Sequence, residues 1–461
     1  MYSVNLNYNK PNYNTINACH VNCKNTATNP SHSGCGSYRS EDVSFGSNTQ
    51  APSQVRTTLS GKTEVDRYNK VVSIADKDTR KVLADMLKSG VLLDANSNDK
   101  STVLDNLYKI VTTERAKGLN PQELVRDTVT SISNPYTITQ QFGDIPKKYE
   151  NIAVGSYLNG QKADANSVKS AQDEINVDHS GTCVAASIEF NLAKKHPAEF
   201  ARFAEGLSSK NMSVNKQIHL KNLTDKSLDA VWLLDAFEIP HDMKNFETAD
   251  LKIAPDKDAI VRAVIQTTDR DDKERSPIDV LMQSAFMNVG SEQSYNSLSD
   301  KRKGKFNQND KGLIEFEKTF TESVVEDKNK LSVTYQTVDD NSKLIGYETD
   351  FNTIKKQITD AINMGENVII GYTQVDNNNV IVNGHEITIT DVKKDKNGKL
   401  IFVCNDTDDG VSKPIEYSED YLLPKIHHAA LPQAVVKDDV NITENWVEGL
   451  NSYKQMKKQA A

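Results

Sequence analysis

The sequence lacks long apolar runs and a recognisable leader. None of its 461 residues lies in a window approaching the roughly 18 consecutive apolar residues that a membrane-spanning helix needs. Its first residues, "MYSVNLNYNKPNYNTINACH", have neither the basic start nor the apolar centre of a Sec signal peptide. We therefore expect no membrane partner, and a protein that is cytoplasmic or exported by a non-Sec route.

Cysteine is scarce as well. Five cysteines, an odd number widely scattered, exclude a disulfide scaffold. Cys19, Cys23 and Cys35 lie near His20 and His32, and thiolate and imidazole are suitable zinc ligands. However, this stretch has no paired CxxC and is rich in Asn, Ser and Thr, which favours a disordered extension. We expect neither a metal nor a cofactor.

An excess of basic residues is also missing. The chain has 55 Lys and Arg against 64 Asp and Glu, a net charge of −9, which argues against binding to a phosphate backbone. One local run, "KRKGK", is better explained as a solvated loop. Nucleic acid is therefore not an expected partner, and the sequence does not indicate an oligomeric state.

Composition and periodicity divide the chain into four parts. The first is an Asn- and Ser-rich extension, the second is helical and could serve as a prosegment or docking domain, the third is mixed, and the fourth is a tail. In the helical part Gly90 is a helix stop, and Asn120 followed by Pro121 is a helix start. The predicted boundaries are 1–60, 61–150, 165–432 and 433–461.

The third part places helices first and strands last. "CVAASIEFNLAKKH", "SPIDVLMQSAFMNVG" and "DFNTIKKQITDAINMG" have helical spacing of apolar residues, whereas residues 291–350 look polar and loop-rich. "NVIIGYT", "NGHEITITDV" and "KLIFVCND" are predicted strands, and Asn397-Gly398 marks a turn between the last two. Helices followed by an antiparallel sheet predict an α+β fold.

Cys183 is the candidate nucleophile. It follows "SGT" at the start of a predicted helix, where the helix dipole and free N–H groups favour a thiolate. Gly181 would let the chain turn tightly and let a substrate approach. The alternative is a small buried cysteine that fills a core.

His385 is the candidate base among nine histidines. It follows Gly384 and opens an alternating strand, with Ile387 and Ile389 on its own face. The alternative is a surface histidine at a strand end. His179 lies near the cysteine but is better explained as a loop histidine. His20 and His32 lie in the N-terminal extension, and His196 ends a helix beside a proline. The four others have no motif around them, so we expect them on the surface: His219, His241, His427 and His428.

A third group should orient the imidazole of His385. A symmetric loop over residues 393–398 would pair Val392 with Lys399 and place Asp406 opposite His385, whereas a bulge would bring Asn405 onto that face. The sequence leaves this choice open, and both residues could belong to an ordinary polar turn.

The three elements together resemble the papain-like cysteine protease superfamily, in a calpain-like or bacterial variant. "GTCVAASIEF" is similar to the family's cysteine-bearing helix start, "GHEITITDV" to its histidine strand, and "KLIFVCNDTDDG" to the strand that ends in its asparagine. "SPIDVLMQSAFMNVGS" is similar to a helix that calpain-like members place between cysteine and histidine. The resemblance covers roughly residues 165–430.

This resemblance implies a thiol protease that hydrolyses peptide bonds through a thioester. Cys183 would be the nucleophile, His385 the base, and Asn405 the orienting residue, with Asp406 as the alternative. Protein or peptide substrates are the implied partners. The family's glutamine shortly before the cysteine, an oxyanion donor, is replaced here by Val177; Gln172, Asn176 or the Cys183 backbone N–H are the substitutes.

Two other functions remain open. The same fold could run acyl transfer, deamidation or isopeptide cleavage with the same triad. A catalytically degenerate papain-like fold, or an unrelated α+β scaffold, could serve as a binding protein, and Val177 in place of the glutamine favours that alternative.

Overall fold

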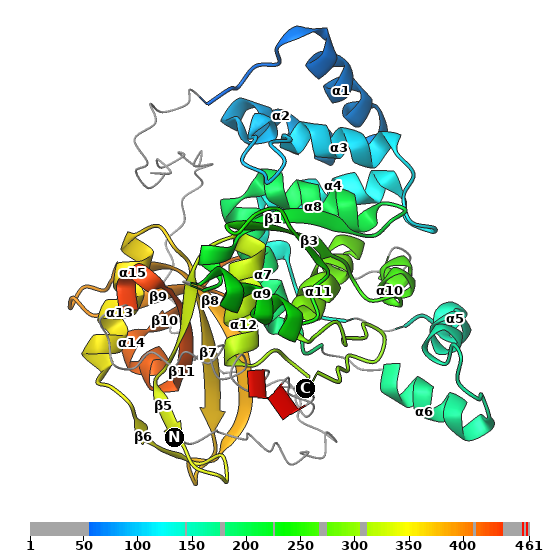
Figure 1. The fold of residues 1–461 in the computed structure, drawn as a ribbon. Helices are drawn as coiled ribbons and strands as arrows, with labels where there is room; N and C mark the ends of the chain where they lie inside the picture. The colour runs from blue at the N-terminus through cyan, green and yellow to red at the C-terminus, as the bar shows by residue number, and fades with distance from the viewer. Residues whose placement is uncertain are drawn as a thin grey trace, which may run out of the picture.

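The architecture is a mixture of helices and antiparallel sheets, as the α+β prediction requires (Figure 1). The computed structural model describes residues 55–142, 145–175, 180–224, 226–266, 274–304, 311–408, 412–436, 454–455 and 458–459. The predicted N-terminal extension therefore lies almost entirely outside the described residues, with its cysteines and histidines.

Helices and a few short 3-10 turns occur along the whole described part of the chain. They are α1 (Gly61–Ile74), α2 (Lys77–Ser89), η1 (Val91–Leu93), α3 (Val103–Thr112), α4 (Pro121–Ser133), η2 (Pro135–Thr137), α5 (Lys147–Tyr157), α6 (Ala165–Ile175), α7 (Cys183–Lys195), α8 (Pro197–Ser208), η3 (Leu220–Asn222), α9 (Ser227–Ala236), α10 (Ala259–Gln266), α11 (Pro277–Gly290), α12 (Glu315–Glu326), α13 (Phe351–Asn363), α14 (Glu419–Leu422), η4 (Leu423–Lys425) and α15 (Gln433–Val436).

The strands form three antiparallel sheets. They are β1 (Val214–His219), β2 (His241–Met243), β3 (Thr248–Ile253), β4 (Lys330–Thr334), β5 (Gln336–Val338), β6 (Leu344–Tyr347), β7 (Val368–Val375), β8 (Ile381–Lys394), β9 (Leu400–Asn405), β10 (Ile415–Ser418) and β11 (Ile426–Pro432). The sheet orders are β1-β3-β2, β10-β9-β8-β7-β11-β4 and β5-β6.

Local signals set the ends of several helices as predicted. Gly90 has a left-handed φ of 83° and ends α2, a conformation that glycine adopts without strain. The side chain of Asn120 accepts a hydrogen bond from Gln122 N at the start of α4. Ser276 caps α11 in a reciprocal capping box with Asp279.

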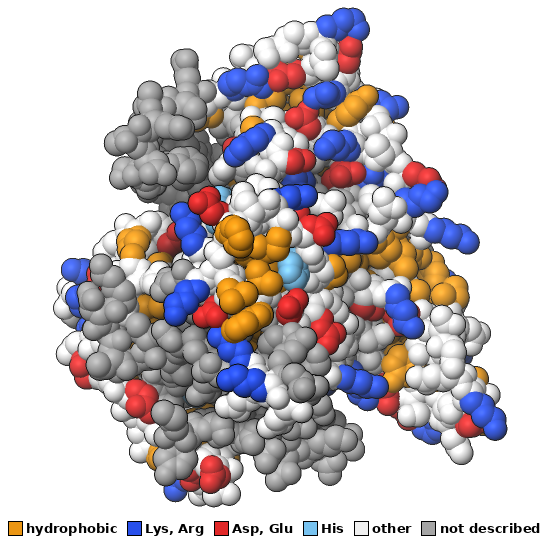
Figure 2. Space-filling view, viewed as in Figure 1, with side chains coloured by type: hydrophobic (Ala, Val, Ile, Leu, Met, Phe, Trp, Pro, Cys, Tyr) orange, Lys and Arg blue, Asp and Glu red, His pale blue; other side chains and the backbone are white. Residues whose placement is uncertain are grey.

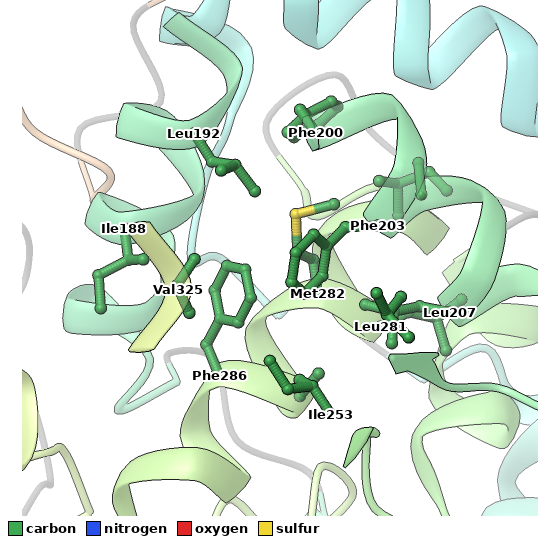
Figure 3. Packing of buried hydrophobic residues seen from close by; sticks show 14 of the residues in the cluster. Ile188, Leu192, Phe200, Phe203, Leu207, Ile253, Leu281, Met282, Phe286 and Val325 are labelled. Carbon is green, nitrogen blue, oxygen red and sulfur yellow. The ribbon is translucent and has the colours of Figure 1, made fainter. Parts of the chain in front are cut away.

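The N-terminal helices share one buried core with the helix that carries Cys183. Side chains from α1–α4 and from α7, α8 and α11 belong to a single hydrophobic cluster. Figure 3 shows its centre, where Phe286 of α11 and Phe203 of α8 meet edge to face at 5.5 Å between ring centroids. Residues 61–138 are thus continuous in their core with the cysteine-bearing helices.

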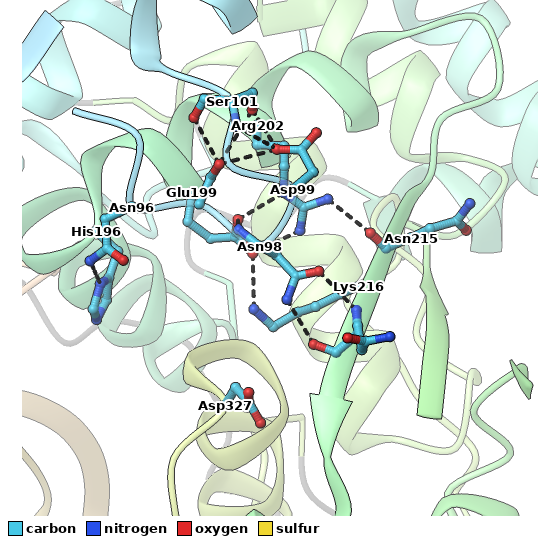
Figure 4. A network of polar contacts seen from close by, with 12 residues as sticks. Asn96, Asn98, Asp99, Ser101, His196, Glu199, Arg202, Asn215, Lys216 and Asp327 are labelled. Carbon is cyan, nitrogen blue, oxygen red and sulfur yellow. Dashed lines mark hydrogen bonds and ion pairs between the residues drawn. The ribbon is translucent and has the colours of Figure 1, made fainter. Parts of the chain in front are cut away.

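A buried ionic network joins the loop before α3 to α8 and β1 (Figure 4). Glu199 accepts hydrogen bonds from Arg202 at 2.7 Å, from Lys216 at 2.9 Å and from the backbone N–H of Asn98 at 2.9 Å. Burial alone would raise the pKa of Glu199, but these donors and charges lower it to about 2. The carboxylate therefore ties three segments together.

The six-stranded sheet is covered on both faces. Ile354 and Ile358 of α13 pack with alternate residues of β7, β8 and β9. On the other face, Ile369 of β7 belongs to the cluster that contains α7, and α12 contacts β4 and β11. The sheet thus presents one face to α13 and the other to α7 and α12 (Figure 1).

The prediction of a polar, loop-rich segment over 291–350 is wrong. Helix α12 and strands β4–β6 occupy it, and most side chains of α12 are buried although many are charged. Burial is possible because the charges are paired: Arg302 with Glu317 at 2.6 Å, for example, and Lys330 with Glu322 at 3.2 Å. A hydropathy pattern cannot foresee such pairing.

The surface carries charges of both signs. Figure 2 shows Lys and Arg side chains interspersed with Asp and Glu over the visible described surface. Within the described residues, no helix combines the length and the apolar character needed to cross a bilayer. The start of the predicted tail, residues 433–436, forms α15, which contacts α13, β4 and β11.

Candidate active site

Cys183 is the first residue of α7, and the loop before it is held from three directions. The hydroxyl of Ser180 donates to the carbonyl of Gln140 at 2.6 Å, and the hydroxyl of Thr182 donates to Oε1 of Gln283 at 2.8 Å. The backbone N–H of Gly181 donates to Oδ2 of Asp300 at 2.7 Å. Cys183 thus stands at the end of α7 whose first-turn N–H groups have no acceptor within the helix.

Gly181 serves a different purpose from the tight turn expected from the sequence. A Cβ at this position would lie 2.7 Å from Cβ of Lys311 and 2.9 Å from its carbonyl carbon. Gly181 is therefore required because the backbone at 311–312 passes directly against it, whereas its own φ lies outside the left-handed region. This close approach helps to fix the cysteine loop.

His385 lies on β8, opposite Tyr372 of β7, where its imidazole bonds to Asp406 and interacts electrostatically with Cys183. The Nε2 atom lies 2.7 Å from Oδ1 of Asp406. Burial lowers the pKa of His385, but the hydrogen bond and charge of Asp406, followed by those of Cys183, outweigh burial and place the pKa well above its ordinary value. Because Asp406 engages Nε2, Nδ1 is the nitrogen left for the sulfur.

The choice between Asn405 and Asp406 is decided by the strand register. Thr388 of β8 pairs with Asn405, so Asn405 points to the face that α7 covers, and the next residue, Asp406, reaches the face of His385. Among the described residues, no hydrogen bond links Asn405 to His385, and the Nδ2 of Asn405 has no partner. The structure brings Cys183, His385 and Asp406 together, but does not bring Asn405 to the imidazole.

The register itself differs from the predicted symmetric loop. Val392 faces Phe402 rather than Lys399, because β8 and β9 extend to the pair Lys394–Leu400. The register then shifts by one residue between Ile389 and Asp391, a β-bulge in β8. The loop is thus shorter than predicted, and β8 contains a bulge. Asp406 nevertheless reaches His385, as the symmetric loop predicted, and the bulge does not bring Asn405 onto that face.

Aromatic rings cover the side of the His385–Asp406 pair. The Tyr372 and Tyr417 rings stack with centroids 6.4 Å apart, and Tyr417 and Tyr421 stack at 5.3 Å. The hydroxyls of Tyr372 and Tyr421 lie 2.7 Å apart. Tyr372 is the cross-strand partner of His385, so this ring group lies beside the His385–Asp406 pair.

The chain matches no protein-family model, and comparisons with curated proteins and with solved structures find no significant match. Arguments about function therefore rest on the geometry of the site. The second described cysteine illustrates the contrast with Cys183: Cys404 is fully buried, and burial raises the pKa of its thiol.

The structure describes only some of the candidate oxyanion donors. Asn176 lies outside the described residues, as do Val177, which replaces the family's glutamine, and His179. Gln172 belongs to α6, and its Nε2 donates to Glu150 of α5 at 3.0 Å, so its amide is already engaged. Helices α5 and α6 are an insertion between residues 138–142 and the cysteine loop (Figure 1).

Gln140 was missed by the sequence analysis. Its carbonyl accepts from Ser180, its N–H donates to the carbonyl of Thr407 at 3.0 Å, and its Oε1 accepts from the Thr407 hydroxyl at 3.3 Å. Gln140 therefore joins the cysteine loop, through its backbone carbonyl, to Thr407, and no described residue is recorded as accepting from its side-chain Nε2. A usable signal was the pair Gln140-Gln141 in the break after the last N-terminal helix.

Two of the histidines expected on the surface are buried. His427 and His428 of β11 are only 7% and 6% exposed, because α12 covers them. By contrast, His219 is more than half exposed and pairs with Asp327 at 2.7 Å. Among the described residues, no hydrogen bond or ion pair links His427, His428 or His219 to Cys183.

Proposed function

We propose that this protein is a cysteine hydrolase that cleaves peptide bonds through a thioester, with Cys183 as nucleophile, His385 as base and acid, and Asp406 as the residue that orients the imidazole. The observation that carries the proposal is the 2.7 Å contact of the His385 imidazole with Asp406, together with the electrostatic interaction of the same imidazole with Cys183. The α+β arrangement, with the cysteine on a helix and the histidine on an antiparallel strand, supports a papain-like fold.

The chemistry follows from these positions. In the resting state Nδ1 of His385 already holds the proton of the Cys183 thiol, and the thiolate attacks the substrate carbonyl carbon. The resulting imidazolium gives that proton to the leaving amine nitrogen as the C–N bond breaks, which leaves a thioester. Water then attacks the thioester with His385 as base, releasing the carboxylic acid and restoring the thiol. Asp406 keeps the imidazole aligned and stabilises its positive charge throughout.

The tetrahedral intermediate requires hydrogen-bond donors for its oxyanion. The backbone N–H of Cys183 at the start of α7 is one donor, and Nε2 of Gln140 is the second that we propose. Gln140 fits this role because Thr407 fixes its Oε1, which leaves the donor end of the amide available. It would replace the glutamine that the resemblance led us to seek at Val177.

The proposal is tested by mapping thiol alkylation across pH in the full chain. We expect Cys183 to alkylate selectively below neutral pH, as a thiolate paired with imidazolium does. Cys404 is an internal control, since burial raises the pKa of its thiol and blocks access. His385→Ala should abolish the selectivity, whereas His219→Ala, a surface histidine with its own carboxylate partner, should leave it unchanged.

Two outcomes would overturn the proposal: equal labelling of Cys183 and Cys404, or no labelling of Cys183 at any pH. Hydrolysis of casein or a peptide library, with Cys183→Ala as the control, then tests peptidase activity directly. Adding a primary amine separates transfer from hydrolysis, because a transferase would give an amide product at the expense of the acid.

A further inference from the structure

Three side chains on the α12 side of the sheet converge in a second cluster. Oε1 of Glu315 lies 2.8 Å from Nε2 of His427 and 3.6 Å from Nδ1 of His428. The three ligand-type atoms all lie within 4.8 Å of one another. This cluster takes no part in the chemistry proposed for Cys183.

The backbone is shaped to bring both histidines to the same carboxylate. Consecutive residues of a regular strand point to opposite faces, but the pairing of β11 with β7 shifts register between Ile426 and His428. His427 is the extra residue at this bulge, so its side chain can turn toward Glu315 together with that of His428. Gly371 of β7 completes the site, because a Cβ there would lie 2.3 Å from the His428 ring.

Neighbouring polar side chains orient Glu315 and His428 within this cluster. The hydroxyl of Thr334 donates to Oε2 of Glu315 at 2.8 Å, which leaves Oε1 directed at the histidines. On the other side of the ring, Nε2 of His428 lies 3.1 Å from Oε1 of Glu386, whose second oxygen pairs with buried Lys318 at 3.2 Å. A carboxylate behind a ligating histidine is the usual support of a metal site.

His428 is buried between two carboxylates with its ring nitrogens short of hydrogen bonds. The residue is only 6% exposed, and neither Nδ1 nor Nε2 makes a hydrogen bond to a described residue, although carboxylate oxygens lie 3.6 Å from Nδ1 and 3.1 Å from Nε2. A cation beside Nδ1, or a second proton on the ring, would satisfy the ring and the facing carboxylate.

We propose that Glu315, His427 and His428 bind a divalent transition-metal ion of the Zn²⁺ class, with Glu386 as the supporting carboxylate. Two imidazoles and one carboxylate suit such an ion, whereas Ca²⁺ and Mg²⁺ prefer oxygen ligands alone. Zn²⁺ in a tetrahedral site separates its ligand atoms by about 3.3 Å, so the His427–Glu315 contact would open slightly. The ion would fasten the start of α12 to β11.

The test is Zn²⁺ titration by calorimetry on the full chain without a histidine tag. Cys183→Ala together with Cys19→Ser, Cys23→Ser and Cys35→Ser removes every thiol that could compete for the ion except that of buried Cys404. This background should bind about one Zn²⁺ per chain and melt at a higher temperature when loaded. His427→Gln and His428→Gln should abolish binding, and Glu386→Gln should weaken it about 10–100-fold. His219→Gln is the matched control and should bind as the background does.

Cobalt substitution gives an independent measurement that does not depend on the variants folding. The background loaded with Co²⁺ should show visible bands typical of nitrogen and oxygen ligands, without thiolate charge transfer. The proposal is overturned if the background binds no Zn²⁺, or if folded His427→Gln and His428→Gln bind it as tightly as His219→Gln does. If those variants fail to fold, unchanged affinity in Glu386→Gln or a cobalt spectrum without such bands would equally overturn it.

Discussion

Nε2 of His385 and Oδ1 of Asp406 lie 2.7 Å apart, although His385 is on β8, Asp406 follows β9, and the two are 21 positions apart in sequence. The contact exists because Asp406 is the first residue beyond β9, on the face opposite to Asn405. Charge and hydrogen bonding in this pair act on both partners: burial raises the pKa of Asp406, but His385 reverses the direction and lowers it.

Replacing Asp406 should impair catalysis more than replacing its neighbour. Asp406→Asn removes the negative charge that raises the pKa of His385, so the imidazolium should lose its proton at a lower pH than in the wild type. The peptidase rate should fall by about 10²- to 10⁴-fold. The rate of Cys183 alkylation as a function of pH measures the first effect, and the rate of peptide hydrolysis measures the second.

Asn405→Ala is the matched control for that substitution. Its side chain lies on the other face, so the alkaline limb of the pH profile should stay in place even if thermal stability falls. A shift of that limb in Asn405→Ala, with none in Asp406→Asn, would contradict the assignment of Asp406.

Gln140→Ala should reduce kcat with little change in KM. A donor that acts on the oxyanion stabilises the transition state more than the bound substrate, and losing one typically costs about 10²–10³-fold in kcat. Gln141→Ala is the control, because the Gln141 amide instead donates to Asp408. An equal loss in both variants, or a change confined to KM, would remove Gln140 from this role.

The buried carboxyl of Asp300 should make stability depend on pH. Burial raises its pKa to about 6, against the opposing effects of Lys311, Gly181 and Tyr295. A raised pKa means that the folded protein binds the proton more tightly than the unfolded chain. The contribution of Asp300 to stability is therefore fully present below its unfolded-state pKa and declines, by up to about 3 kcal/mol, as pH rises from about 4 to about 6.

Urea unfolding at a series of pH values measures this dependence. Asp300→Asn, which cannot ionise, should flatten the decline over that interval, whereas Asp327→Asn, at a partly exposed carboxylate, should not. A decline of the same size in Asp300→Asn would show that another group is responsible.

Phe286→Ala should strongly destabilise the shared helical core. The side chain is fully buried and packs against Phe203, so its loss removes apolar burial and leaves a cavity, at a cost of about 3–5 kcal/mol. Phe246 is 86% exposed, and Phe246→Ala should change the free energy of unfolding by no more than about 0.5 kcal/mol. Chemical denaturation of the two variants makes the comparison.

Short-range signals in the sequence determined much of the secondary structure. Gly90, Asn120 and Ser276 mark helix ends because they act on backbone groups within a few residues. Strand alternation likewise placed His385 on the face of Ile387 and Ile389, and the helix pattern placed Cys183 at a helix start. These relationships need no partner from elsewhere in the chain.

Only the tertiary structure decided which groups meet. The hairpin register and the bulge after Ile389 select Asp406 over Asn405, and a slip of one residue would reverse that choice. Gln140 reaches the cysteine loop across the inserted α5 and α6, and the charges of α12 are buried because their partners come from other segments. Contacts between distant segments depend on how elements pack, which local periodicity does not encode.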